Sequence, residues 1–205
     1  MKYVSVMALL ALASLAGCGS SGIAYAPIGG GGAACNKTNI INTGFNFDWT
    51  CWDRTPTKPG TIPGFPTFTL KTSDSCVPSQ QGNPFAAIEA PGGSAGYLSQ
   101  QFIDHGTPQS VSFRVWGGTD PVTVTVGIVF PTGLLIGTET ILDTFTPPTV
   151  RSSPTTCNGG APITKTYSFS RSDFGPGSLI EIRLHVTSNG VNDATANFDD
   201  ITSSP

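Results

Sequence analysis

The stretch Ile180-Glu181-Ile182-Arg183-Leu184-His185-Val186 alternates strictly between apolar and polar side chains. Successive side chains of a β-strand point to opposite faces of the sheet, so this period of two predicts a strand that buries its apolar side chains on one face. From Ile40 onward the sequence shows no convincing period of 3.6 residues, which an amphipathic helix would require. The pattern therefore indicates an all-β protein.

Similar alternations and short apolar runs, bounded by Gly, Pro, Ser and Asn, recur along the chain. They predict about nine strands, at residues 67–71, 85–90, 96–102, 111–116, 122–126, 134–142, 167–170, 180–186 and 194–201. Because no helical segment separates these runs, we expect them to form two antiparallel sheets packed as a sandwich.

The charge of the chain limits its partners. Its 205 residues carry a formal net charge of −3, and only 11% of them are charged. No cluster of Lys and Arg is present that could neutralise a row of phosphates. Nucleic acid is therefore excluded as an expected partner.

The N-terminus begins with an apolar run over residues 4–16, too short to span a bilayer as a stable helix. It ends in Leu15-Ala16-Gly17-Cys18, which resembles the lipobox of bacterial lipoproteins. The resemblance implies that residues 1–17 are a signal peptide and that Cys18 is acylated, for example with palmitate, as a membrane anchor. We expect residues 18–34, rich in Gly, to be a tether and residues 35–205 one domain, held at the outer membrane or cell surface.

Four further cysteines are an even number in a chain that we expect to be exported to an oxidising compartment. They predict two disulfides, and four cysteines allow three pairings. We favour the pairs Cys35–Cys51 and Cys76–Cys157. The second pair would pin residues 143–162, a stretch with four prolines that is longer than an ordinary connection between strands and is either a functional loop or a stapled insertion.

Three short motifs resemble those of a known family. They are Asn42-Thr43-Gly44-Phe45 followed by Trp49, then Gly96-Tyr97-Leu98-Ser99-Gln100, and finally Phe198-Asp199-Asp200-Ile201. Their order and spacing over residues 42–203 resemble the galactose-binding-like jelly rolls, in particular the carbohydrate-binding modules appended to bacterial cellulases and xylanases. The resemblance implies a jelly-roll sandwich that binds carbohydrate.

Many members of that family hold a structural calcium ion between the first and last strands. Carried over by position, the candidate ligands are Asn46 and either Asp199 or Asp200. The family usually has an acid where this chain has Asn46, and an uncharged amide oxygen predicts weaker calcium binding. In the alternative interpretation, the two acids only terminate a strand.

Exposed aromatic rings are the best sequence signal for a sugar site, because the apolar faces of sugars stack on them. Trp116 alternates with the apolar residues of its strand, which predicts that it lies beside Arg114 on the opposite face, as a platform or as a plug under a loop. Trp52 has the opposite parity to Trp49 and is a second candidate. Tyr97 and Gln101 share one face of their strand and complete the predicted ligand-binding set.

Carbohydrate binding without catalysis is therefore the predicted function. The alternative is a structural or adhesive envelope protein that contacts another protein. A serine hydrolase is a third possibility, because residues 92–96 match Gly-x-Ser-x-Gly and Asp104-His105 follows. A nucleophile elbow needs a strand before its serine and a helix after it, whereas here Pro91 precedes the motif and a strand pattern follows it.

Overall fold

The computed structural model describes residues 39–40, 43–45, 48–60, 64–105, 108–130, 138–170, 178–190 and 194–204. Within these ranges the chain forms twelve β-strands and one short 3-10 helix, η1 (Pro78–Gln80), but no α-helix. None of the helical structure described there is long and apolar enough to cross a bilayer. The predicted signal peptide, the tether, Cys18, Cys35 and Asn46 lie outside the described residues.

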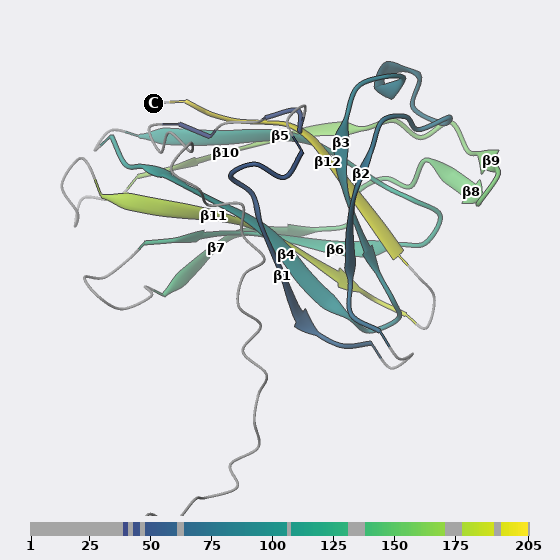
Figure 1. Cartoon of the computed structure of the whole chain (residues 1–205), viewed down its shortest axis with the longest axis horizontal. Helices are drawn as coiled ribbons and strands as arrows, with labels where there is room; N and C mark the ends of the chain where they lie inside the picture. Colours follow the sequence, from purple (N-terminus) through teal and green to yellow (C-terminus); the bar gives the residue numbers. More distant parts are fainter. Residues whose placement is uncertain are drawn as a thin grey trace, which may run out of the picture.

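Two five-stranded antiparallel sheets pack face to face, which confirms the predicted sandwich (Figure 1). Sheet A contains, in spatial order, β1 (Asp53–Lys58), β4 (Ala95–Ile103), β11 (Leu179–Ser188), β6 (Val122–Val129) and β7 (Glu139–Phe145). Sheet B contains β10 (Ile163–Phe169), β5 (Gln109–Gly117), β12 (Ala194–Ser204), β3 (Phe85–Ala90) and β2 (Thr67–Lys71). A separate two-stranded ribbon consists of β8 (Arg151–Ser153) and β9 (Thr156–Cys157).

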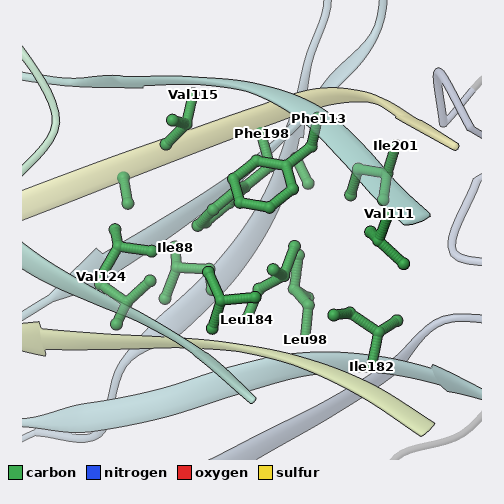
Figure 2. Packing of buried hydrophobic residues seen from close by; sticks show 14 of the residues in the cluster. Ile88, Leu98, Val111, Phe113, Val115, Val124, Ile182, Leu184, Phe198 and Ile201 are labelled. Carbon is green, nitrogen blue, oxygen red and sulfur yellow. The ribbon is translucent and has the colours of Figure 1, made fainter. Parts of the chain in front are cut away.

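The main core lies between the two sheets and follows the alternation of the sequence. On β11, Ile182 and Leu184 are fully buried, and Phe113 of β5 meets Phe198 of β12 edge to face, with ring centroids 6.0 Å apart. Figure 2 shows the labelled side chains of both sheets meeting in this layer. The polar residues of the same strands consequently form the outward faces of the sandwich.

Nine of the twelve strands correspond to the predicted runs, and β1, β8 and β9 were not predicted. Pro56 lies within β1 and cannot donate a hydrogen bond to a sheet, which argues against a central strand. In the structure β1 is an edge strand, and its pairing with β4 shifts between Pro56 and Lys58. Proline is tolerated at such an edge, so the sequence pattern was misleading here.

The start of the described chain runs beside the last strand, as the family resemblance implied. The Ile201 amide donates a hydrogen bond of 3.0 Å to the Thr43 carbonyl, and the Ile40 amide donates one of 3.0 Å to Ser203 Oγ. Between Asp199 and Thr202 the pairing of β12 with β5 shifts, and Asp200 has a φ of 51°. This bulge returns Ile201 to the core.

Candidate functional site

The outer face of sheet A carries a group of polar and aromatic side chains that contact one another. Strand pairing arranges its outward residues in rows, and paired residues share a face. The three rows that we call the outer face of sheet A are Asp53–Ser99–Arg183–Gly127–Ile141, Gln101–Glu181–Val129–Glu139 and Thr55–Tyr97–His185–Thr125–Thr144.

Arg183 lies at the centre of this face, on the central strand β11. Its Nε donates to Glu181 Oε1 at 2.8 Å, and its Nη1 lies 3.4 Å from Glu139 Oε2. Burial of the guanidinium lowers its pKa, but the hydrogen bond and the charges of the two glutamates outweigh burial and raise the pKa above its ordinary value. Arg183 is therefore a fixed cation, with its planar group held in one orientation.

Glu139 links two distant strands of the sheet. It belongs to the edge strand β7, and its side chain crosses β6 to contact residues of β11. While Oε2 faces Arg183, Oε1 lies 2.5 Å from Nε2 of His185. The carboxylate is thus placed over the middle of the sheet by two side chains from another strand.

Tyr97 supplies the aromatic component of the face. Its ring is half-buried and lies 4.8 Å, centroid to centroid, from the imidazole of its cross-strand partner His185. The Cζ atom of Arg183 lies 5.0 Å from the Tyr97 ring centroid, a cation–π distance. A phenol, an imidazole and a guanidinium therefore form one continuous surface of planar groups.

A third acid, Asp53, borders this cluster from the edge strand β1. Burial raises the pKa of Asp53, the charge of Glu181 raises it further, and the charge of Arg54 opposes both effects. Asp53 and Glu181 therefore interact electrostatically across the face.

This arrangement suits a ligand that is rich in hydroxyl groups. Arg183 donates hydrogen bonds, Glu139 and Glu181 accept them, and Tyr97 offers part of an aromatic ring. Among the described residues, no group of three or more His, Cys, Asp or Glu side chains is arranged to hold a metal ion. The side chains on this face can contact a ligand through hydrogen bonds and ring contacts.

Two of the residues predicted to bind ligand, Tyr97 and Gln101, lie on this face, and Gln101 is exposed. The other three lie elsewhere. Arg114 lies on sheet B, where its Nη1 is 3.5 Å from Asp200 Oδ2. The prediction that Trp52 is exposed was wrong, because its ring is fully buried and packs 5.5 Å from the ring of Phe45.

The prediction that Trp116 is an exposed platform was also wrong, although its parity was right. Trp116 lies on the side of β5 away from the main core, but it is fully buried in a second apolar cluster. Its ring packs 4.9 Å from that of Phe85, and its Nε1 donates a 3.0 Å hydrogen bond to Asp74. Trp116 is therefore the covered plug that the sequence left as the alternative.

The segment that covers Trp116 is held by a disulfide and an ion pair. Cys76 is bonded to Cys157, which confirms one predicted pair, and Arg151 forms an ion pair with Asp74. Residues 143–162 therefore include a stapled insertion on the outside of sheet B. Cys51 is also disulfide-bonded, and its predicted partner, Cys35, lies outside the described residues.

The two predicted calcium ligands on β12 differ in their surroundings. Asp199 is fully buried, and its Oδ2 accepts hydrogen bonds of 2.8 Å from both Gln80 and Asn83. Its Oδ1 is buried and makes no hydrogen bond to another of the residues that the structure describes. Asp200 is exposed and faces Arg114, while the third candidate, Asn46, lies outside the described residues.

Sequence reasoning did not assign a binding role to four residues of the central cluster. The polar half of the 180–186 alternation contained Glu181, Arg183 and His185, and three charged or titratable side chains on one face of a strand were a usable signal. No local signal identified Glu139, because its position over β11 depends on the order of strands in the sheet.

The Gly-x-Ser-x-Gly match does not form a catalytic triad with the neighbouring acid. Ser94 is fully buried in the turn that precedes β4, and Asp104 directly follows the other end of the same strand. An extended strand of this length separates the two residues by roughly 30 Å. The motif is a Gly-rich turn between two strands.

Comparison with known proteins supports the fold. No family model matches the chain, and no curated protein matches it. Among solved structures, the carbohydrate-binding module TmCBM61, in complex with β-1,4-galactotriose, is similar with a TM-score of 0.53 at 16% identity. The alignment covers 82% of this chain and 99% of that module.

Two structures from Clostridium thermocellum are similar with a TM-score of 0.50. The family 11 carbohydrate-binding module of a cellulosomal cellulase is 12% identical, and the alignment covers 82% of this chain and 95% of the module. The CBM22-1 and GH10 modules of a xylanase, complexed with xylohexaose, are 13% identical, and the alignment covers 83% of this chain but 29% of that one. At such identities the similarity defines the class of fold, the jelly-roll sandwich found in carbohydrate-binding modules.

Proposed function

We propose that this protein is a non-catalytic lipoprotein of the bacterial cell envelope that binds carbohydrate on the outer face of sheet A. The observation that carries the proposal is the contact of Tyr97 with His185 and Arg183 on an outward sheet face. The carbohydrate-binding modules that share its fold support the ligand class. The Leu15-to-Cys18 motif at the end of an apolar leader supports the lipid anchor.

Sheet B offers a less suitable surface. The segment joined by Cys76–Cys157 covers its aromatic region around Trp116. Elsewhere on this face, small hydroxyl side chains bond to one another, as in the contacts Ser110–Ser204 at 2.6 Å and Ser112–Thr166 at 3.0 Å. The combination of a half-buried aromatic ring with fixed charged groups is therefore a feature of sheet A.

The exposed side chains favour glycan over a protein partner. Within the described ranges, one large hydrophobic side chain is exposed. It belongs to Ile141, which has a relative accessible surface of 52%. A protein interface normally centres on a contiguous patch of apolar and aromatic side chains, and one isoleucine does not make such a patch. A structural or adhesive role in the envelope is the outcome that we would accept if no glycan binds.

We also propose that calcium, where bound, is structural and uses Oδ1 of Asp199. The assignment is supported by the burial of this oxygen, which makes no hydrogen bond within the part of the chain that the structure describes. Asp200 is a weaker ligand because its carboxylate faces Arg114.

A glycan array probed with the full chain tests the function directly. We expect binding to at least one β-linked polysaccharide or its oligosaccharides and loss of that binding in Tyr97→Ala. Because Tyr97 is half-buried and outside the main core, the variant should remain folded. A wild-type chain that binds no glycan on the array, while binding an envelope protein, would overturn the proposal.

A further inference from the structure

Gly127 provides the space that Glu139 occupies. A Cβ atom built on Gly127 would lie 2.7 Å from Cδ and 2.9 Å from Cγ of Glu139, closer than Cβ contacts in real proteins. Glu139 pairs with Val129, two residues along β6, so its side chain leans back over Gly127. The missing side chain at residue 127 thus lets a carboxylate cross from the edge strand to the centre of the sheet.

Donors on β11 fix the carboxylate once it has crossed. Its two oxygens face different partners, His185 at 2.5 Å and Arg183 at 3.4 Å. The exposed fraction of the Glu139 side chain is 21%, so it remains in contact with solvent at the surface where a ligand would lie. Glu139 is therefore positioned as part of the binding surface.

The charges around this position are mostly negative. The three rows contain three carboxylates, Asp53, Glu139 and Glu181, against the guanidinium of Arg183 and the imidazole of His185, and the charge of Arg54 acts on Asp53. Lys58 lies in the next row, at the far end of β1 beyond Thr55 and Tyr97. Because Arg183 is already paired with both glutamates, a negatively charged ligand would meet the excess of carboxylates.

We propose that Glu139, laid across Gly127, makes the outer face of sheet A select uncharged glycans and reject those that carry carboxylate or sulfate groups. This inference rests on the proposed carbohydrate-binding function. Two negative charges about 6 Å apart near a protein surface repel each other by more than the free energy equivalent to a tenfold change in affinity. Gly127 is a positioning residue in this account.

Pairs of oligosaccharides that differ in charge alone test the inference. Cello-oligosaccharides would be compared with their C6-carboxylated forms, and mannan with mannuronan oligosaccharides, at low ionic strength. Where either member of a pair binds, we expect the affinity of the full chain for the neutral member to be higher by at least about tenfold. The preference should decrease with added salt, which screens charges beyond roughly 10 Å at 0.1 M.

Variants locate the source of the preference. Glu139→Gln should reduce the ratio of the affinity for the neutral oligosaccharide to the affinity for its carboxylated form. Gly127→Ala should reduce this ratio as well, because it displaces Glu139. Adding Gly127→Ala to Glu139→Ala should change the ratio no further, which separates positioning from a general effect on the strand. The matched control is Glu89→Gln, which removes a negative charge that is paired with Lys71 on sheet B and should leave the ratio unchanged.

The two proposals fail in different ways. Equal or tighter binding of the carboxylated members by the wild type, or an unchanged ratio in Glu139→Gln, would overturn the inference while leaving carbohydrate binding intact. Absence of binding to every neutral and charged glycan would overturn the proposed function, and this inference with it.

Discussion

The indole Nε1–H of Trp116 donates a 3.0 Å hydrogen bond to Oδ2 of Asp74, a residue 42 positions earlier in the chain. The Oδ1 atom of the same carboxylate accepts a 3.0 Å bond from the Cys76 amide and faces Arg151. One buried acid therefore fastens the covering segment to the tryptophan beneath it and to the insertion that carries β8. This contact closes the outer face of sheet B at the place where sequence parity predicted a sugar platform.

Replacing Trp116 should destabilise the protein without affecting glycan binding. Trp116→Ala removes a fully buried ring, and we expect the free energy of unfolding to fall by about 3–5 kcal/mol. Urea denaturation followed by circular dichroism measures this loss. Trp116→Phe keeps a smaller aromatic ring in the cluster but removes the indole donor to Asp74, and the lost hydrogen bond alone should cost about 1–3 kcal/mol. A Trp116→Ala variant as stable as the wild type would show that the ring is not a plug.

The period of two in the sequence was sufficient to predict most of the fold. Each strand buries one face, and this burial causes apolar and polar residues to alternate. Stretches such as residues 180–186 and 111–116 therefore show their inward side chains directly. The pattern fails where burial comes from a distant segment. Parity placed Trp116 opposite the core correctly, but nothing near it in sequence shows that Cys76 and Cys157 bring a cover over it.

The candidate site was less visible in the sequence for a related reason. The alternating sequence of their own strand predicts that Arg183 and His185 face outward. Glu139, in contrast, comes from a strand two positions away in the sheet. Its contribution depends on strand order, on the shift of pairing between Val126 and Gly127, and on the absence of a side chain at Gly127. None of these three conditions leaves a periodic signal.

The stability difference between wild type and Asp199→Asn should depend on pH. Burial raises the pKa of Asp199 above its ordinary value of 3.8, and the hydrogen bond from Gln80 opposes this shift only in part. The folded state therefore prefers the protonated acid, a stabilisation that is fully present below pH 3.8 and is lost as pH rises through the raised pKa. In chelator, the stability of the wild type relative to Asp199→Asn should fall over a range that lies above pH 3.8. Urea unfolding across this range measures the difference. A free energy of unfolding of the wild type that rises relative to that of the variant with increasing pH would contradict the assignment.

Calcium should stabilise the folded state through the same residue. A ligand that binds the native state alone raises the melting temperature with its concentration, so millimolar calcium should raise it above the value in chelator. Asp199→Asn removes the charged oxygen and should abolish most of that shift. Differential scanning calorimetry of the wild type and of Asp199→Asn, each with calcium and with chelator, measures these shifts in melting temperature. An identical melting temperature of the wild type with and without calcium would remove the metal from the account.

The lipid anchor gives a prediction that does not depend on the domain. In a lipoprotein, cleavage after Gly17 makes the acylated Cys18 the first residue, so mass spectrometry of the mature protein should find an N-terminal cysteine with a mass increase that corresponds to acyl chains. Cys18→Ala should move the protein from the membrane fraction to the soluble fraction. Unmodified Cys18, or equal membrane retention of the variant, would show that the leader is not a lipoprotein signal.

The central claim is that glycan binds on the outer face of sheet A, and two arginines on opposite sheets test it most directly. Arg183→Ala and Arg114→Ala make the same change on sheet A and sheet B, respectively. Isothermal titration with a glycan identified on the array, on variants shown by melting to be folded at the assay temperature, gives both affinities. The account predicts a loss of at least about tenfold for Arg183→Ala and an affinity within about twofold of wild type for Arg114→Ala. Full binding by Arg183→Ala together with loss in Arg114→Ala would place the site on sheet B and contradict the account.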